Sequence, residues 1–296
     1  MQSLIELLKS VFFGIVEGIT EWLPISSTGH LILLQEWLPF AFSEDRAFVA
    51  AYWEMFGVVI QLGAILAVVV LFWQRLFPFA GHRTARERRE VWSLWGKVLI
   101  GCIPAGIIGT LGDKILEKIT GKDIDGWLFN AWTVAIALIV YGIAFLVIER
   151  VNQNRTPVVT DLRELSLSQA FSVGLFQALS IIPGTSRSGS TILGSMLIGL
   201  SRPVAAEYSF FLAIPVMAGA SGIKALGFFR YISETGTQVP EEAWLLLAVG
   251  CLVSFLVSLL VIRFLTDFVK RHTFVPFGIY RILLGAAVLL YFLLVR

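Results

Sequence analysis

Charged residues are scarce in this chain of 296 residues, because Asp, Glu, Lys and Arg together make up only 15% of it. A soluble domain carries about 25% charged residues. Hydrophobic residues reach 57%, and the mean hydropathy is +0.81. The chain therefore lacks the polar surface that a water-soluble fold of this length needs, and we interpret it as an integral membrane protein.

Cysteine is also rare. The two residues of this type, Cys102 and Cys251, both fall inside apolar stretches, so no disulfide framework is expected. The N-terminus lacks a basic segment before its apolar part and a small-residue cleavage site, which argues against a cleaved signal peptide.

Long apolar stretches dominate the rest of the sequence. Six of them approach the roughly 20 residues that cross a bilayer as a helix: Phe56–Trp73, Val98–Leu111, Trp127–Ile148, Val204–Leu226, Trp244–Phe264 and Phe274–Val295. The pattern predicts an all-α polytopic membrane protein with about six transmembrane helices, forming a single integral membrane domain over residues 1–296.

Basic residues gather in three of the connecting segments, 74–97, 149–163 and 263–271. The alternate segments, 113–125 and 226–242, hold fewer basic residues and several acids. The positive-inside rule places the three basic segments in the cytoplasm, so six spans leave both termini on the extracytoplasmic side. Topology and anionic lipid headgroups explain the arginines near residues 83–89, and no nucleic-acid partner is expected.

The sequence resembles itself when it is shifted by 160 residues. Gly14–Leu33 then lies over Gly174–Leu193 without a gap, and both copies read apolar helix, proline, hydroxyl-rich turn, glycine and apolar helix. Three predicted spans separate the copies, so the second copy enters the membrane from the opposite side. This predicts an inverted-topology repeat, with repeat one at roughly 1–150 and repeat two at roughly 165–296.

Each copy is too interrupted to form a simple span. Pro24 removes a backbone donor, and the hydroxyl residues that follow it favour caps and turns over helix interior. We therefore expect two re-entrant helical hairpins, at 5–38 and 167–200. Irregular backbone at membrane depth requires surrounding protein or a wet cavity, so the two tips are expected to enclose a polar site.

The second helix of each hairpin begins at its tip, near Thr28 and near Ser188. Free N–H groups and the helix dipole favour an anion there, and an arginine fork suits phosphate oxygens. The alternatives are that the hydroxyls only cap helices and that the arginine only snorkels or pairs for packing. The expected phosphate-binding residues are Thr28, Gly29, Ser186, Arg187, Ser188 and Gly189.

The first copy supplies acids and a histidine. Glu17 and Glu21 are four residues apart and face one side of a helix, where they could bind a divalent cation or act as acid and base. The alternative is a solvent-facing pair. His30 is a candidate base or phosphate donor, or an ordinary core histidine.

The two copies match at backbone-shaping positions and differ at reactive ones. Ser27 aligns with Arg187, and Glu17 aligns with Gln177. The first copy thus holds the acids, a hydroxyl nucleophile and the histidine, and the second holds the anion clamp. This division favours phosphoryl chemistry over a symmetric ion pathway.

The segments Glu17–His30 and Pro183–Thr191 closely resemble the two signature motifs of the bacterial undecaprenyl-diphosphate phosphatase family, which is linked to bacitracin resistance. The resemblance covers essentially the whole chain, including Phe274–Arg281. Ser190 is a minor departure, because alanine is common there in the family, and we expect no loss of activity from it.

The resemblance implies hydrolysis of undecaprenyl diphosphate to undecaprenyl phosphate and inorganic phosphate, which recycles the lipid carrier for peptidoglycan and other envelope polymers. It also implies dependence on a divalent cation, Mg²⁺ or Ca²⁺, and a multi-pass protein of the bacterial plasma membrane whose site opens to the extracytoplasmic side. A lipid flippase for the same carrier is the competing hypothesis, because inverted repeats with broken helices are typical of transporters. The oligomeric state stays open, a homodimer included.

Within this hypothesis, Ser27 is the first candidate nucleophile and His30 is its base and later an acid. Ser26 is the second candidate nucleophile, and direct attack by an activated water is the third alternative. Arg187 and the cation held by Glu17 and Glu21 offset the charge of the transferring group. Glu54 or Glu207 is expected near the cavity or at an interface, and Arg281 is expected to snorkel at a cytoplasmic helix end.

Overall fold

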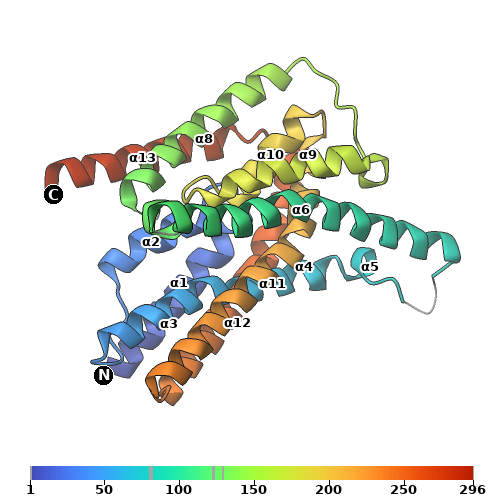
Figure 1. Ribbon diagram of the computed structural model, residues 1–296. Helices are drawn as coiled ribbons and strands as arrows, with labels where there is room; N and C mark the ends of the chain where they lie inside the picture. Colours follow the sequence, from blue (N-terminus) through green and yellow to red (C-terminus); the bar gives the residue numbers. More distant parts are fainter. Residues whose placement is uncertain (1, 80–82, 122–123, 129, 296) are drawn as a thin grey trace.

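The computed structural model describes residues 2–79, 83–121, 124–128 and 130–295 (Figure 1). Every named element within those ranges is an α-helix or a short 3-10 helix. Six helical segments are long and apolar enough to cross a bilayer. The predicted fold class, an all-α polytopic membrane protein, is therefore confirmed.

The α-helices fall into two hairpins and the long helices that surround them. In chain order they are α1 (Gln2–Thr20), α2 (Ser27–Trp37), α3 (Arg46–Val59), α4 (Gln61–Leu71), α5 (Trp73–Leu76), α6 (Ala85–Thr120), α7 (Ile124–Leu128), α8 (Ala131–Asn152), α9 (Leu167–Ala178), α10 (Arg187–Leu197), α11 (Arg202–Thr235), α12 (Glu241–Arg271) and α13 (Val275–Val295). Two 3-10 helices, η1 (Leu162–Glu164) and η2 (Leu179–Ile181), flank α9.

Several spanning helices are longer than the apolar stretches that predicted them. The loops between them are therefore shorter than expected. Helix α6 begins with a capping box between Thr84 and Glu87 and ends at Gly121, which adopts a left-handed conformation with φ of 75°. The helix therefore continues through its polar ends. The caps satisfy the free backbone groups at these ends, so the ends do not need apolar residues to stay helical. Most of the expected loop 113–125 is helical for this reason. Phe129, within the predicted span 127–148, lies outside the described residues.

The segment 226–242 is likewise shorter as a loop than expected, because α11 continues to Thr235. The predicted span 56–73 is instead a longer, interrupted helical segment, α3 and α4, with a break at Ile60. The predicted membrane spans are thus long helices that continue past their apolar parts into charged ends.

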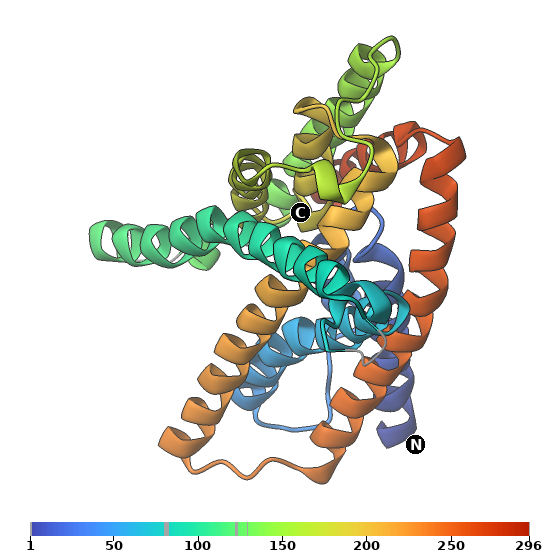
Figure 2. The ribbon, with the colours of Figure 1, turned by 90° about the vertical axis from the view of Figure 1, so that its right-hand side faces the viewer.

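Each hairpin packs its first helix against a long helix from the other half of the chain. Helix α1 packs against α12, and α9 packs against α6 (Figures 1 and 2). Glycine makes both contacts possible, since a Cβ at Gly14 would lie 2.7 Å from the carbonyl oxygen of Gly250, and one at Gly174 would lie 2.3 Å from that of Gly101. The two halves are therefore interlocked, and the hairpin loops are brought together.

The long helices α11 and α12 are joined at their separated ends by residues 236–240, and α3 and α4 pack against both (Figure 2). A buried cluster of large side chains packs around the first hairpin loop, which itself contributes Trp22. Trp22 contacts Phe210 edge to face at 5.4 Å, and Phe72 contacts Phe210 and Phe211. This apolar cluster therefore packs against the first hairpin loop.

Candidate active site

The two hairpin tips share one unusual backbone feature. Ser26 and Ser186 precede α2 and α10, with φ of 76° and 71°, a region that side-chain-bearing residues rarely adopt. Each serine Oγ accepts a hydrogen bond from the N–H of the glycine three residues later, Gly29 at 3.3 Å and Gly189 at 3.1 Å. These caps satisfy helix-end donors and offset the backbone strain.

The same caps alter the predicted role of the two glycines. Gly29 and Gly189 were expected to present free N–H groups to an anion, but both amides donate within the cap. A Cβ at Gly189 would also lie 3.0 Å from a guanidinium nitrogen of Arg281. The missing side chain at Gly189 thus leaves room for Arg281, and phosphate binding by either glycine stays a prediction.

An ion pair joins the two hairpins. Arg187 Nη2 donates to Glu21 Oε1 at 2.8 Å, and both side chains are largely buried. The other carboxylate oxygen, Oε2, accepts a hydrogen bond from Ser27 Oγ at 2.5 Å. The predicted nucleophile, acid and anion clamp therefore form one contiguous cluster.

Neighbouring groups fix the orientation of Arg187. Its Nη1 donates to the carbonyl oxygen of Ser209 at 2.7 Å and to Ser209 Oγ at 3.1 Å. The guanidinium carbon lies 5.7 Å from the ring centre of Trp22, a cation–π arrangement. The sequence-based reasoning missed Ser209 and Trp22, because neither stands out from its apolar surroundings.

His30 lies on the same helix as Ser27, and its two ring nitrogens bond to other groups. Its Nδ1 lies 2.6 Å from the carbonyl oxygen of Ser26, and its Nε2 lies 2.8 Å from the hydroxyl of Tyr280. A carbonyl can only accept, so Nδ1 carries the proton and Nε2 of the neutral ring accepts from Tyr280. No hydrogen bond joins Ser27 to His30 among the residues that the structure describes, and Ser27 donates to Glu21 instead.

Glu17 is fully buried. Its polar neighbour is the carboxylate of Glu21, which is close enough to share a hydrogen bond with it, and no other side chain or backbone group that the structure describes bonds to its two oxygens. Gln177 is the residue that aligns with Glu17 when the sequence is shifted by 160 residues. It is also fully buried, and its side-chain oxygen and nitrogen have no hydrogen-bond partner among the described residues. A buried carboxylate beside a second carboxylate is costlier than a buried neutral amide, so Glu17, and not Gln177, is the candidate for contact with a cation.

Ser188 ties the second tip to the first. Its hydroxyl is buried and lies 3.1 Å from the carbonyl oxygen of Glu21 and 3.3 Å from that of Leu23. Ser188 therefore positions the first hairpin loop, in addition to its proposed part in phosphate binding. Thr28, by contrast, is half-buried at the start of α2.

Arg281 contradicts its expected location. It is fully buried, and its guanidinium donates to three main-chain carbonyl oxygens: Pro24 at 2.9 Å, Gly184 at 2.7 Å and Thr185 at 2.9 Å. It therefore bridges both hairpin loops and does not snorkel at a helix end. Sequence reasoning missed it because its partners are carbonyls, which no side-chain pattern reveals.

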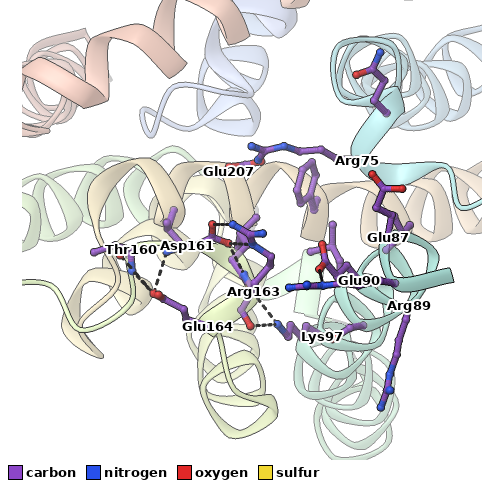
Figure 3. Close-up of a pocket in the computed structure, with 18 of the residues that line it drawn as sticks. Arg75, Glu87, Arg89, Glu90, Lys97, Thr160, Asp161, Arg163, Glu164 and Glu207 are labelled. Atoms are coloured by element: carbon purple, nitrogen blue, oxygen red, sulfur yellow. Dashed lines mark hydrogen bonds and ion pairs between the residues drawn. The ribbon is translucent and has the colours of Figure 1, made fainter. Parts of the chain in front are cut away.

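A cavity of about 1000 Å³ lies elsewhere, between α5, α6, η1 and the start of α11 (Figure 3). It is lined by charged side chains that mostly pair with one another, including Arg75 with Glu207 and Arg163 with Asp161 at 2.7 Å. Hydrogen bonds from Arg163 lower the pKa of Asp161 to about 2. Glu207 thus belongs to this surface cavity, and the side chain of Glu54 is exposed and pairs with Lys224 at 3.6 Å.

Together these contacts define a polytopic membrane protein with a buried acid–hydroxyl–arginine site built from two helical hairpins. Residues 10–287 match the family described as bacitracin resistance protein BacA, and the chain belongs to that family. Three curated relatives from Streptococcus pyogenes, of serotypes M4, M3 and M1, each carry the name undecaprenyl-diphosphatase. Each is 52% identical over 288 residues, which covers 97% of this chain and 97% of the relative. The resemblance in the signature motifs is thereby confirmed.

Proposed function

We propose that this protein hydrolyses undecaprenyl diphosphate to undecaprenyl phosphate and inorganic phosphate, recycling the lipid carrier and conferring bacitracin resistance. Membership of the BacA family and the name of its 52% identical relatives support this function. The observation that carries the mechanism is the buried chain of contacts from Ser27 through Glu21 to Arg187. A nucleophile, a base and an anion clamp are the parts that phosphoryl transfer requires.

In the first step we assign the attack to Ser27. Its Oγ forms a bond to the terminal phosphorus while the bond from that phosphorus to the bridging oxygen breaks, and undecaprenyl phosphate leaves. Glu21 takes the Ser27 proton, because its Oε2 already accepts a hydrogen bond from that hydroxyl. Ser26 stays the second candidate nucleophile; its Oγ is engaged in the helix cap.

In the second step, water attacks the phosphoserine and releases inorganic phosphate. We assign His30 to this step as the base, because the lone pair of Nε2 can accept the water proton directly or through the Tyr280 hydroxyl. Glu21, which was protonated in the first step, returns its proton to the departing serine oxygen along the same contact, and the proton on the His30 ring leaves with the released phosphate. Direct attack by water on the diphosphate, without a phosphoserine, is the alternative that trapping experiments distinguish.

Arg187 supports the charge that moves during both steps. Its side chain already binds a carboxylate, so a phosphoryl oxygen can take one of its donors by the same planar, charge-assisted geometry. Ser186, Ser188 and Thr28 are proposed to supply further donors at the two helix starts. A largely buried position strengthens these interactions relative to water.

The residues also fit a divalent cation, Mg²⁺ or Ca²⁺. Glu17 offers two buried carboxylate oxygens whose polar neighbour within the described residues is the carboxylate of Glu21, so the two acids lie together. No group of three or more acidic, histidine or cysteine side chains gathers there within those residues. Glu17 and Glu21 would hold the cation, and when bound it would neutralise phosphate charge.

For the membrane arrangement, we propose a single domain over residues 1–296 in the bacterial plasma membrane. The repeat-related halves, roughly 1–150 and 165–296, contribute the hairpins at 5–38 and 167–200. The basic segments then lie in the cytoplasm, both termini lie outside, and the site opens to the extracytoplasmic side. Six apolar helices of sufficient length support the multi-pass character.

Release of phosphate from undecaprenyl diphosphate by the purified protein in detergent micelles tests the proposed activity. A flippase has no transport to perform in a micelle, so micellar turnover separates hydrolysis from the competing transport hypothesis. Substrate labelled at the terminal phosphate tests the covalent step: label retained on wild-type protein after a quench, and lost in Ser27→Ala, supports the phosphoserine. A fully active enzyme that never carries label would exclude it.

A further inference from the structure

Arg281 has no role in the two reaction steps proposed for this protein. It lies near the start of α13, far along the chain from either signature segment, and its side chain is fully buried. Its three hydrogen bonds all go to main-chain oxygens, one in the first hairpin loop at Pro24 and two in the second at Gly184 and Thr185.

The three acceptors lie close to the reactive groups on both sides. Pro24 stands between Glu21 and Ser27 in the chain, and Thr185 stands two residues before Arg187. Thr185 is itself fixed, since its hydroxyl lies 2.7 Å from the carbonyl oxygen of Ile182 and 3.0 Å from that of Leu179. The guanidinium of Arg281 thus joins the loop of the nucleophile directly to the loop of the anion clamp.

The packing around Arg281 leaves little freedom. Its guanidinium carbon lies 5.3 Å from the ring centre of Tyr141, and its Nη1 lies where a Cβ on Gly189 would be 3.0 Å away. A side chain at position 189 would therefore press on the guanidinium. Gly184 adopts φ of 93°, and a Cβ there would lie 2.6 Å from the carbonyl oxygen of Val134. The structure holds this loop in one conformation, with its carbonyls facing Arg281.

The charge of Arg281 is not neutralised by an acid. Every ion pair found in the described part of the chain involves other residues, and the guanidinium is bound only by carbonyl dipoles and an aromatic ring. A buried positive charge without a carboxylate is costly. An anionic group bound nearby would reduce that cost.

We propose that Arg281 is a positioning residue for the hydrolysis. It sets the spacing between the loop carrying Ser27 and the loop carrying Arg187, and its unneutralised charge favours the bound diphosphate. This inference rests on the proposed assignment of Ser27 and Arg187 to the reaction. Misplacement of reacting groups by about 1 Å can cost about 100-fold in rate, so the spacing is a quantity that catalysis depends on.

Two substitutions separate spacing from charge. Arg281→Met keeps the approximate length and removes both functions, so we expect a fall in kcat of about 100-fold together with a raised KM. Arg281→Lys keeps the charge, but one ammonium cannot reproduce the planar fork. We expect this variant to lower kcat about tenfold at an unchanged KM.

The assay measures phosphate release per folded protein in micelles, with monodisperse elution and the melting temperature as folding criteria. Arg202→Lys is the matched control, because it makes the same exchange at an arginine paired with Glu149, away from both loops, and should keep wild-type kcat and KM. A purely structural role would reduce the folded fraction and leave KM unchanged.

Folded Arg281→Met with kcat and KM close to wild type would overturn the proposal. If that variant does not fold, Arg281→Lys decides: lowered kcat supports it, and wild-type kcat refutes it. Failure of both variants to fold also refutes it, because Arg281 would then serve global stability. Ser27→Ala and Arg187→Ala, measured in parallel, report on the proposed site itself: if they keep activity, that site fails regardless of Arg281.

Discussion

Ser26 and Ser186 lie 160 positions apart and are the two non-glycine residues with positive φ in the part of the chain that the structure describes. Both cap the second helix of a hairpin through the same bond to a glycine N–H. The sequence shift that relates the two halves is thus matched by a shared backbone conformation at the two tips.

The Ser26 cap makes a stability difference measurable. Ser26→Ala loses the hydroxyl acceptor and keeps a side chain at positive φ, so we expect a loss of about 1–2 kcal/mol. Ser26→Gly loses the same acceptor but relieves the backbone strain, so its melting temperature should lie between wild type and Ser26→Ala. Ser201 precedes α11 without a side-chain cap bond, and Ser201→Ala should change little. An equal loss for Ser26→Gly and Ser26→Ala would show that strain is not released there.

Interlocking of the halves depends on close helix contact at Gly174. Gly174→Ala places a Cβ 2.3 Å from the backbone oxygen of Gly101, and we expect a destabilisation of about 1–3 kcal/mol from overpacking. Gly106 faces open space on the partner helix α6, so Gly106→Ala is the matched control and should not lower the melting temperature. Thermal unfolding in detergent measures both, and equal melting temperatures would contradict the contact.

The ion pair between Glu21 and Arg187 predicts strongly coupled losses of activity. Arg187→Ala and Glu21→Gln should each reduce phosphate release by about 100- to 1000-fold. Because the two side chains share one contact, the double variant should lose far less than the product of the single effects. Multiplicative losses in the double variant would instead mean that the residues act independently.

Glu17 predicts opposite changes in stability and in cation dependence. Glu17→Gln removes the charge of a buried carboxylate that lies against the carboxylate of Glu21, so the melting temperature without divalent cation should rise. The cation concentration for half-maximal activity should rise as well, because one proposed ligand loses its charge. Gln177→Leu is the control at the related position, and it should leave the cation titration unchanged. An unaltered titration in Glu17→Gln would remove this residue from the cation site.

The sequence was sufficient for the features that depend on residue type and local pattern. Hydropathy predicted the spans, and the break at Pro24 with the hydroxyl residues after it predicted the first hairpin. The limits of α6 were missed because the capping box at Thr84 and the glycine at 121 extend a helix past its apolar part. Propensity and caps, which act over a few residues, decide such ends.

Contacts between residues far apart in the sequence could not be predicted from local sequence patterns. His30 looked like the partner of Ser27 because the two are three residues apart, yet the ring turns toward Tyr280 on α13. Glu21, six residues before Ser27, makes the contact instead. The position of Arg281 was missed for the same reason. Its partners are main-chain carbonyl oxygens, which every residue has.

Arg281 also has a consequence for biosynthesis. The residue that bridges the two loops belongs to α13, and α1 packs against α12, more than two hundred residues away. The first hairpin therefore stays in the membrane without these partners until α12 and α13 have been translated. A ribosome that stalls before α13 leaves every proposed reacting side chain synthesised and the loops that carry them unjoined, so truncated products should be inactive although they contain both signature segments.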